Sequence, residues 1–341
     1  MARFFKSDNT APIAPQILAA IASANDDFAQ GYGEDNWSLQ LDGRFSKLFE
    51  RDVRVFPVST GTAANSLAIA TLVPPYGAVL THQESHMVRD ECGAPEFMSG
   101  GARLMLIEGL QAKITPLALS AALKSNPTSV HTVQPRALSI TQATELGTVY
   151  QPEEIYQLCS IAHENSLIVH MDGARFANAI AYLGCSPAEV TWKAGVDVMS
   201  FGATKNGALS AEAVIFFDTT RISDFEFRRK RSAHLLSKMR FVSAQLLAYL
   251  DNELWLKLAK RANSLAQRLG TAAGSLLMHP VQANEVFVKI GITGAKTLRT
   301  ANFEFYDWGS ADSGEARLVV SWNQPTEDID HLCEVLQRLS S

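Results

Sequence analysis

A single lysine, Lys205, follows a hydrophobic run in the stretch VDVMSFGATKNGA at residues 196–208. Small residues and an Asn-Gly pair surround this lysine, which is typical of a turn at the end of a buried strand. Lysine is seldom buried without a partner, but in a pocket of low polarity its amine can form a Schiff base. The stretch alone fits this interpretation and a solvated turn lysine equally well.

A second stretch, IVHMDGARFANA at residues 168–179, places Asp172 at the end of an apolar run and Arg175 three residues later. One interpretation is a structural ion pair between the two side chains. The other is a carboxylate that holds a cationic ring nitrogen, beside an arginine that contacts a ligand oxygen or carboxylate.

A third stretch, VSTGTAAN at residues 58–65, leads from an apolar run through small residues into a predicted helix. Free amides at a helix N-terminus bind phosphate readily, so Gly61 and Thr62 are candidates for a phosphate cradle. An N-capped helix with nothing bound fits the stretch equally well. The stretch lacks the lysine of a Walker loop and the glycine spacing of a dinucleotide fingerprint.

Together the three stretches match what pyridoxal phosphate (PLP) requires. Its phosphate needs amides and a hydroxyl, its pyridine nitrogen needs a carboxylate, and its aldehyde needs an amine. His86, in THQESHMVRD, follows another apolar run and could stack on the ring and act as a base, although a polar loop histidine is the simpler interpretation. His82 lies closer to the predicted strand, and His131 is a more remote second base.

The elements that must position these residues form a regular series. Seven short apolar runs predict strands at 53–58, 77–81, 102–107, 136–141, 166–172, 196–201 and 212–217, with helices at 38–50, 61–72, 116–124 and 152–164. Continuous rather than alternating hydrophobicity favours an α/β fold with a mostly parallel sheet covered on both faces. In such sheets ligands bind beyond the carboxyl ends of the strands, where the candidate residues lie.

The C-terminal part of the chain has a different pattern of predicted helices and strands. Residues 231–270 are helical in pattern throughout, and two short strands, NEVFVKI and ARLVVSW, precede a predicted helix at 326–339. We therefore expect a large PLP-binding domain over residues 1–240 and a smaller α+β domain over residues 241–341.

Composition and charge exclude several classes of protein. A net charge of −5 leaves no basic excess for a nucleic-acid partner, and no apolar run approaches the roughly 20 residues of a membrane-spanning helix. The N-terminus lacks the apolar core of a signal peptide, which favours the cytoplasm. Four cysteines, at 92, 159, 185 and 333, have no metal-ligand spacing and are interpreted as reduced core residues, with no metal site expected.

Over nearly its whole length the sequence resembles the low-specificity threonine aldolases, of the β-eliminating lyase group of fold-type-I PLP enzymes. The stretches that carry the resemblance are SDNTAP, GYGEDNW, STGTAANSLA, SHMVRDECGAPEF, HMDGARFANA, FGATKNGA, SKMRF and ARLVVSW. DGAR followed by TKNGA is the most specific pair. The resemblance implies an aspartate-aminotransferase-like fold in which residues 1–37 contribute to the active site.

The resemblance also implies a role for each matched position. Lys205 would bind the PLP aldehyde, Asp172 the pyridine nitrogen, and Gly61 and Thr62 the phosphate; His86 would stack on the ring and help to deprotonate the substrate hydroxyl; Arg175 would contact the ring oxygen or the substrate carboxylate; Ser7 and Arg317 would bind that carboxylate; and Arg231 would reach the phosphate of a neighbouring subunit. A homo-oligomer, dimer or tetramer, with active sites shared between subunits follows from the same resemblance.

The implied reaction is the retro-aldol cleavage of a β-hydroxy-α-amino acid, such as L-threonine or L-allo-threonine, to glycine and an aldehyde. A β-eliminating lyase, an aminotransferase and a non-catalytic relative that binds PLP or an amino acid are the alternatives. One departure concerns the base: TQATE at residues 141–145 stands where many members carry a second histidine in an ENTHN-like stretch. Gln142, His131 or a bound water could take its place.

Overall fold

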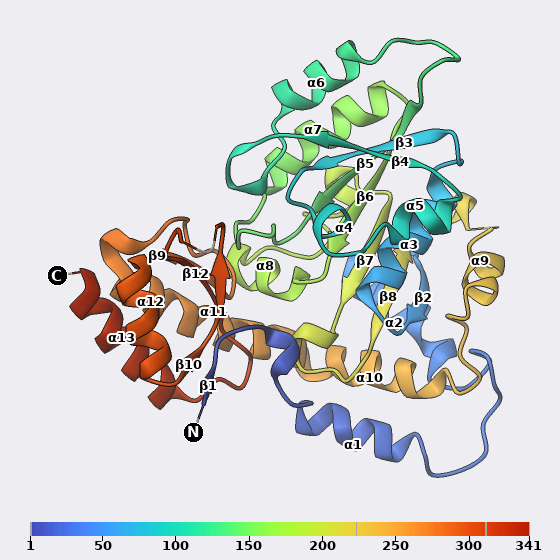
Figure 1. The fold of residues 1–341 in the computed structure, drawn as a ribbon. Helices are drawn as coiled ribbons and strands as arrows, with labels where there is room; N and C mark the ends of the chain where they lie inside the picture. Colours follow the sequence, from blue (N-terminus) through green and yellow to red (C-terminus); the bar gives the residue numbers. More distant parts are fainter. Residues whose placement is uncertain (1, 223, 311, 341) are drawn as a thin grey trace.

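A seven-stranded sheet forms the centre of the molecule in the computed structural model, which describes residues 2–222, 224–310 and 312–340 (Figure 1). In spatial order its strands are β2 (Arg54–Val58), β8 (Glu212–Phe216), β7 (Val198–Gly202), β6 (Ile168–Gly173), β5 (Gln134–Thr141), β3 (Gly77–His82) and β4 (Arg103–Ile107). Only β8 runs antiparallel to its neighbours β2 and β7; the other pairs are parallel. The prediction of a mostly parallel α/β sheet is confirmed.

Helices cover this sheet, and four of them occupy predicted ranges: α2 (Leu41–Phe49), α3 (Gly61–Leu72), α6 (Pro116–Ser125) and α7 (Pro152–Glu164). Threonine side chains start two of them, because Thr60 accepts a hydrogen bond from the Ala63 N–H and Thr115 from the Ala118 N–H. The remaining helices of this part are α1 (Pro15–Ser23), α4 (His86–Arg89), α5 (Ala94–Ser99) and α8 (Phe176–Leu183).

The helical pattern predicted over residues 231–270 is interrupted twice. Helix α9 (Phe225–Arg231) ends where that pattern begins, and α10 (Arg240–Leu250) and α11 (Leu254–Ala273) follow as separate helices. Between the last two, Asn252 and Glu253 have φ angles of 51° and 56°, which a right-handed helix does not accept. The expectation of continuous helix was therefore wrong at these turns.

A smaller antiparallel sheet lies in the C-terminal part, in the order β11 (Tyr306–Trp308), β12 (Glu315–Val319), β9 (Glu285–Lys289). Helices α12 (Gly291–Thr300) and α13 (Thr326–Ser340) belong to the same part. The first strand of the chain, β1 (Arg3–Phe4), pairs in parallel with β10 (Phe303–Glu304), so the N-terminus lies beside C-terminal elements (Figure 1).

Helix α11 contributes to two hydrophobic cores. Its first half, including Trp255 and Leu258, packs into the core of the large sheet, and its second half, from Leu265 onward, packs into the core of the small sheet. Phe5, near the N-terminus, also belongs to the second core. The domain boundary between residues 240 and 241 stays a prediction.

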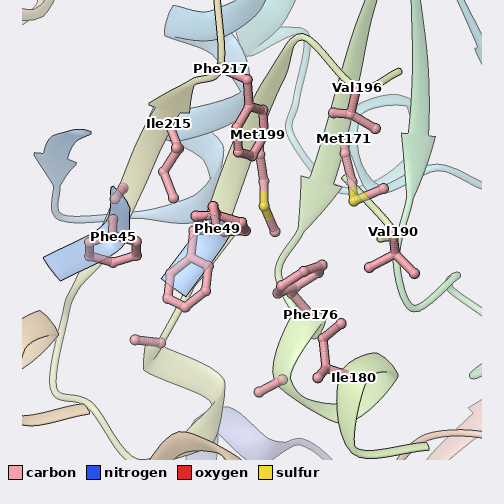
Figure 2. Packing of buried hydrophobic residues seen from close by; sticks show 14 of the residues in the cluster. Phe45, Phe49, Met171, Phe176, Ile180, Val190, Val196, Met199, Ile215 and Phe217 are labelled. Carbon is pink, nitrogen blue, oxygen red and sulfur yellow. The ribbon is translucent and has the colours of Figure 1, made fainter. Parts of the chain in front are cut away.

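Aromatic side chains fill the main core on one face of the large sheet (Figure 2). Phe49 of α2 is fully buried, with its ring centroid 5.0 Å from that of Phe217 and 6.3 Å from those of Phe45 and Phe176. This packing holds α2 and α8 against the strands whose carboxyl ends carry the candidate residues.

We expect Phe49→Ala to lower the free energy of unfolding by ~3–5 kcal/mol, because a large buried side chain would leave a cavity. Urea unfolding monitored by circular dichroism measures the change. Leu117→Ala, at an 81% exposed position of α6, is the control and should change little. A Phe49→Ala loss no larger than that of the control would contradict the packing described.

Two further predictions, on membrane-spanning helices and on the cysteines, can be compared with the structure. Among the described residues, no helix combines the length and the apolar character needed to cross a membrane. All four cysteines are free thiols, but only Cys159 is buried, and Cys92 is exposed. The interpretation of the cysteines as core residues was therefore wrong for Cys92, which follows a buried glutamate in the turn after α4.

Candidate active site

A cavity of about 310 Å³ opens at the carboxyl ends of the parallel strands, within the range typical of small-molecule sites. Its lining includes six of the residues predicted from the sequence: Gly61, Thr62, His86, Asp172, Arg175 and Lys205. These residues come from α3, the start of α4, β6, the turn after β6 and the turn after β7, and the sheet brings them to one edge.

The start of α3 forms one end of the cavity. A Cβ atom added at Gly61 would meet no atom within 4 Å, so glycine leaves open space here that a side chain would fill. The first N–H groups of a helix have no partner inside the helix, and Ser59 and Thr62, whose side chains carry hydroxyl groups, line the cavity as well. These donors fit a phosphate.

Asp172, in β6, is a fixed negative charge in the cavity wall. Its side chain is almost fully buried; Oδ2 accepts a hydrogen bond from Asn65 Nδ2 at 2.9 Å and Oδ1 accepts one from the Ala174 N–H at 3.0 Å. A buried carboxylate needs such donors or a cation nearby. It is suited to pair with a protonated ring nitrogen.

Lys205 lies in the turn after β7, within a short 3-10 helix (Thr204–Asn206). Its side chain is half-buried because it faces the cavity rather than the protein core. Burial raises the pKa values of Glu145 and Glu212, and the positive charge of Lys205 opposes that rise; the same charge helps to lower the pKa of Asp8, which places the amine among these three carboxyls. The amine is thus accessible from the cavity and surrounded by carboxyl groups.

A chain of side-chain hydrogen bonds connects Asp172 to His86. Asn65 Nδ2 donates to Asp172 and also to Glu91 Oε1 at 2.8 Å, and Glu91 Oε1 lies 2.9 Å from His86 Nδ1. The hydrogen bond to Glu91 raises the pKa of His86 against the opposing effect of burial. With Nδ1–H donating a hydrogen bond to Glu91, the Nε2 atom of His86 is left for other partners.

Arg175 pairs with Asp8 and Glu285 rather than with Asp172. Its Nε donates to Asp8 Oδ2 at 2.8 Å, and its Nη1 lies 3.4 Å from Glu285 Oε1. The interpretation of Asp172 and Arg175 as a mutual structural pair was therefore wrong. Arg317 donates to the same Glu285 oxygen at 2.6 Å, so one carboxylate holds both arginines.

The Asp8–Arg175 pair makes a testable contribution to stability. Burial raises the pKa of Asp8, but the charges of Arg175 and Lys205, with hydrogen bonds from Arg175 and Asn284, outweigh burial and lower it from 3.8 to about 2. A carboxyl whose pKa is depressed by folding stabilises the protein above its unfolded pKa, and this contribution is lost as the pH falls through the folded value.

We expect Asp8→Asn to be less stable than the natural chain by ~2 kcal/mol near neutral pH, with a gap that narrows as the pH falls below 3.8 toward 2. Denaturant unfolding at a series of pH values measures this difference in the free energy of unfolding. Asp26→Asn, at an exposed position of the loop after α1, is the control. A difference in unfolding free energy that does not change with pH would contradict the lowered pKa of Asp8.

Three predicted residues lie outside the cavity lining. Ser7 accepts a hydrogen bond from the Asn9 N–H, and Asn9 is the residue of that segment that reaches the cavity. Arg317, in β12, is held by Glu285 of β9. Arg231, at the end of α9, lines a separate hollow of about 790 Å³ together with Phe97 and Phe227.

The structure also places the alternative bases. His131 is exposed on the loop before β5, and His82 uses both ring nitrogens on backbone groups of Glu84 and Gly109. Gln142 is fully buried and exchanges two hydrogen bonds with the backbone of Tyr150. None of these three faces the cavity, so the suggestion that His131 or Gln142 fills the place of a second histidine was wrong.

Several residues of the site were not singled out from the sequence: Asp8, Asn65, Glu91, Glu145, Glu212 and Glu285. The sequence contained a signal for two of them, because Asn65 is the amide in a mostly apolar helix and Glu212 opens a continuous apolar strand. Within residues 2–222, 224–310 and 312–340, no group of three or more His, Cys, Asp or Glu side chains is arranged to hold a metal ion.

A family model for β-eliminating lyases matches residues 5–293. This chain belongs to the β-eliminating lyase family. Two relatives in the family are named low-specificity L-threonine aldolase: one from Pseudomonas aeruginosa is 43% identical, covering 96% of this chain and 95% of its own length, and one from a Pseudomonas species is 41% identical, covering 99% and 98%.

Solved structures agree on the fold. A threonine aldolase from Leishmania major matches with a TM-score of 0.93 at 26% identity, over 99% of this chain and 100% of that one. A serine palmitoyltransferase from S. paucimobilis with bound PLP shares the fold, with a TM-score of 0.72 at 15% identity, over 99% and 87% of the two chains. The fold is that of fold-type-I PLP enzymes.

Proposed function

We propose that this chain is a PLP-dependent lyase that cleaves L-threonine, L-allo-threonine and related β-hydroxy-α-amino acids to glycine and an aldehyde. The observation that carries the proposal is the meeting of Lys205, Asp172 and the start of α3 in one cavity of a β-eliminating lyase. The full-length similarity to two low-specificity L-threonine aldolases supports the choice of substrate.

The residues around the cavity fit PLP. Gly61 and Thr62 would bind its phosphate through their N–H groups, Asp172 would pair with its pyridine nitrogen, and Lys205 would bind its aldehyde. When bound, PLP holds the amino group of the substrate and accepts the electron pair of the broken Cα–Cβ bond.

The protein's own groups orient the substrate and move the proton. Arg317 and Ser7 would bind the α-carboxylate, with Arg175 beside the ring oxygen or that carboxylate, so that the Cα–Cβ bond stands perpendicular to the ring. For Arg317 this requires the α-carboxylate to share the guanidinium with Glu285. His86 would stack on the ring and assist removal of the β-hydroxyl proton. General-base assistance of this kind is worth about 10²–10⁴-fold in rate.

A homo-oligomer, dimer or tetramer, is part of the proposal. Arg231 lies on the hollow beside α9 rather than on the cavity of its own chain, which suits a residue that serves the phosphate of a neighbouring subunit. Residence in the cytoplasm and the absence of nucleic-acid partners belong to the same proposal.

The test combines a spectrum with a product assay. The protein purified with PLP should show the visible absorbance of a Schiff base, and L-threonine or L-allo-threonine should yield aldehyde and glycine in equal amounts. Pyruvate or another keto acid would instead assign elimination or transamination. A Schiff-base spectrum without any product would indicate a non-catalytic relative, and no such absorbance would refute PLP binding.

A further inference from the structure

Glu145 is a carboxyl group in the cavity to which neither the sequence nor the proposed reaction assigns a task. It follows β5 and lines the cavity together with His86 and Lys205. Its Oε1 accepts a hydrogen bond from the backbone N–H of His86 at 3.2 Å. In the part of the chain that the structure describes, no hydrogen bond to Oε2 is formed, so this oxygen is available to a ligand.

The other carboxyls of the cavity are occupied. Asp172 accepts hydrogen bonds from Asn65 and Ala174, and Glu91 Oε1 accepts from Asn65 and His86, while Glu91 Oε2 has no partner among the described residues but is fully buried. Glu212 accepts from the backbone and the side chain of Thr204. Glu145 is therefore the cavity carboxyl whose position leaves it open to a substrate.

Burial makes the Glu145 carboxylate a stronger base than an exposed glutamate. Burial raises its pKa, the positive charges of Lys205 and His86 oppose that rise, and the negative charges of Asp172 and Glu285 add to it. A base is most effective when its pKa approaches the operating pH. His86 fits this task less well, because its own raised pKa increases the fraction that is already protonated.

We propose that Glu145 accepts the proton of the substrate's β-hydroxyl group. This inference rests on the proposed cleavage of β-hydroxy-α-amino acids. The O–H bond breaks and its proton moves to Glu145; the aldehyde C=O forms as the Cα–Cβ bond breaks, and the electron pair of that bond remains on the glycine fragment bound through PLP. A proton then returns to Cα, so that substrate gives glycine and aldehyde without a further reactant.

In this assignment Glu145 takes the place of His86 as the base of the proposed reaction, and His86 acts as a positioning residue. Its backbone N–H holds Glu145 Oε1 and its side chain is anchored by Glu91, so the stacking histidine and the base form one unit. The carboxyl group at residue 145 also explains how TQATE can work without a histidine in this stretch.

The test uses the full-length enzyme with bound PLP and the variant Glu145→Gln, which keeps an oxygen to accept the His86 N–H. We expect kcat for L-threonine cleavage to fall by ~10²–10⁴-fold. In the dependence of kcat on pH, the loss of activity at low pH that comes from protonation of the Glu145 carboxylate should disappear. Glycine has no hydroxyl group. Its dissociation constant, from a spectral titration, and the exchange of its α-hydrogen in D2O should therefore be unchanged.

Glu84→Gln is the matched control, since Glu84 pairs with Arg89 outside the cavity; it should leave all four readouts unchanged. An unchanged kcat in Glu145→Gln would overturn the inference, and so would an equal loss of glycine exchange, which would indicate a general structural role. A natural chain that binds glycine but does not cleave L-threonine would refute the proposed function itself, whatever the variant does.

Discussion

Lys205→Ala is expected to eliminate the visible Schiff-base absorbance of the enzyme and to lower threonine cleavage by ~10⁴–10⁶-fold, as removal of a covalent catalytic group does in other enzymes. The alanine side chain carries no amine for the PLP aldehyde. The phosphate donors at the start of α3 and the carboxylate of Asp172 remain in place, so PLP should still bind without a covalent bond.

Absorbance spectra and equilibrium dialysis of the variant separate these two effects. Lys193→Ala is the control, because Lys193 pairs with Glu50 on the surface, away from the cavity. Normal absorbance and turnover in Lys205→Ala would show that another amine binds the cofactor, and would remove the basis of the assignment. Loss of non-covalent PLP as well would point to a collapsed site rather than to a missing amine.

The second large effect concerns Asp172→Asn. An amide at this position can still occupy the space beside Asn65 and the Ala174 N–H, but it carries no negative charge. Its NH2 group would donate to the pyridine nitrogen and stabilise the unprotonated ring, which accepts electrons poorly. Loss of a single preorganised electrostatic group typically costs about 10²–10³-fold in kcat, and we expect at least this loss for threonine cleavage.

Steady-state kinetics and a titration of PLP affinity measure the two consequences of this change. PLP affinity should fall, because the charge pair with the ring nitrogen is lost, while the Schiff base with Lys205 should still form. Asp90→Asn, at an exposed position just after α4, is the control. Full activity in Asp172→Asn would mean that the ring nitrogen does not depend on this carboxylate.

The large sheet could be predicted because each buried strand corresponds to a short run of apolar residues in the sequence. The runs at 77–81 and 212–217, for example, match β3 and β8 to within one residue at each end. The turns in 231–270 could not be predicted, because the residues at positive φ, Asn252 and Glu253, do not include the glycine that normally signals such a turn.

The candidate site was predictable where a residue type and a strand end coincide, as for Lys205 and Asp172. It was not predictable where a side chain's partner is remote in sequence. Asn65 meets Asp172 across 107 positions, and Arg175 meets Asp8 across 167. Glu145 was visible only as a departure from the family pattern, since its approach to His86 depends on the fold of the segment after β5.

The pairing of β1 with β10 has a consequence for the synthesis of this protein. Arg3 is synthesised 300 positions before its partner Phe303, so at typical elongation rates the N-terminal segment waits roughly 15–60 s for its partner strand. Asp8, which holds Arg175, sits on that waiting segment. The segment that carries Asp8 is therefore anchored through β1 only after residue 303 has been synthesised, and nascent chains halted before that residue would lack this anchor of the cavity.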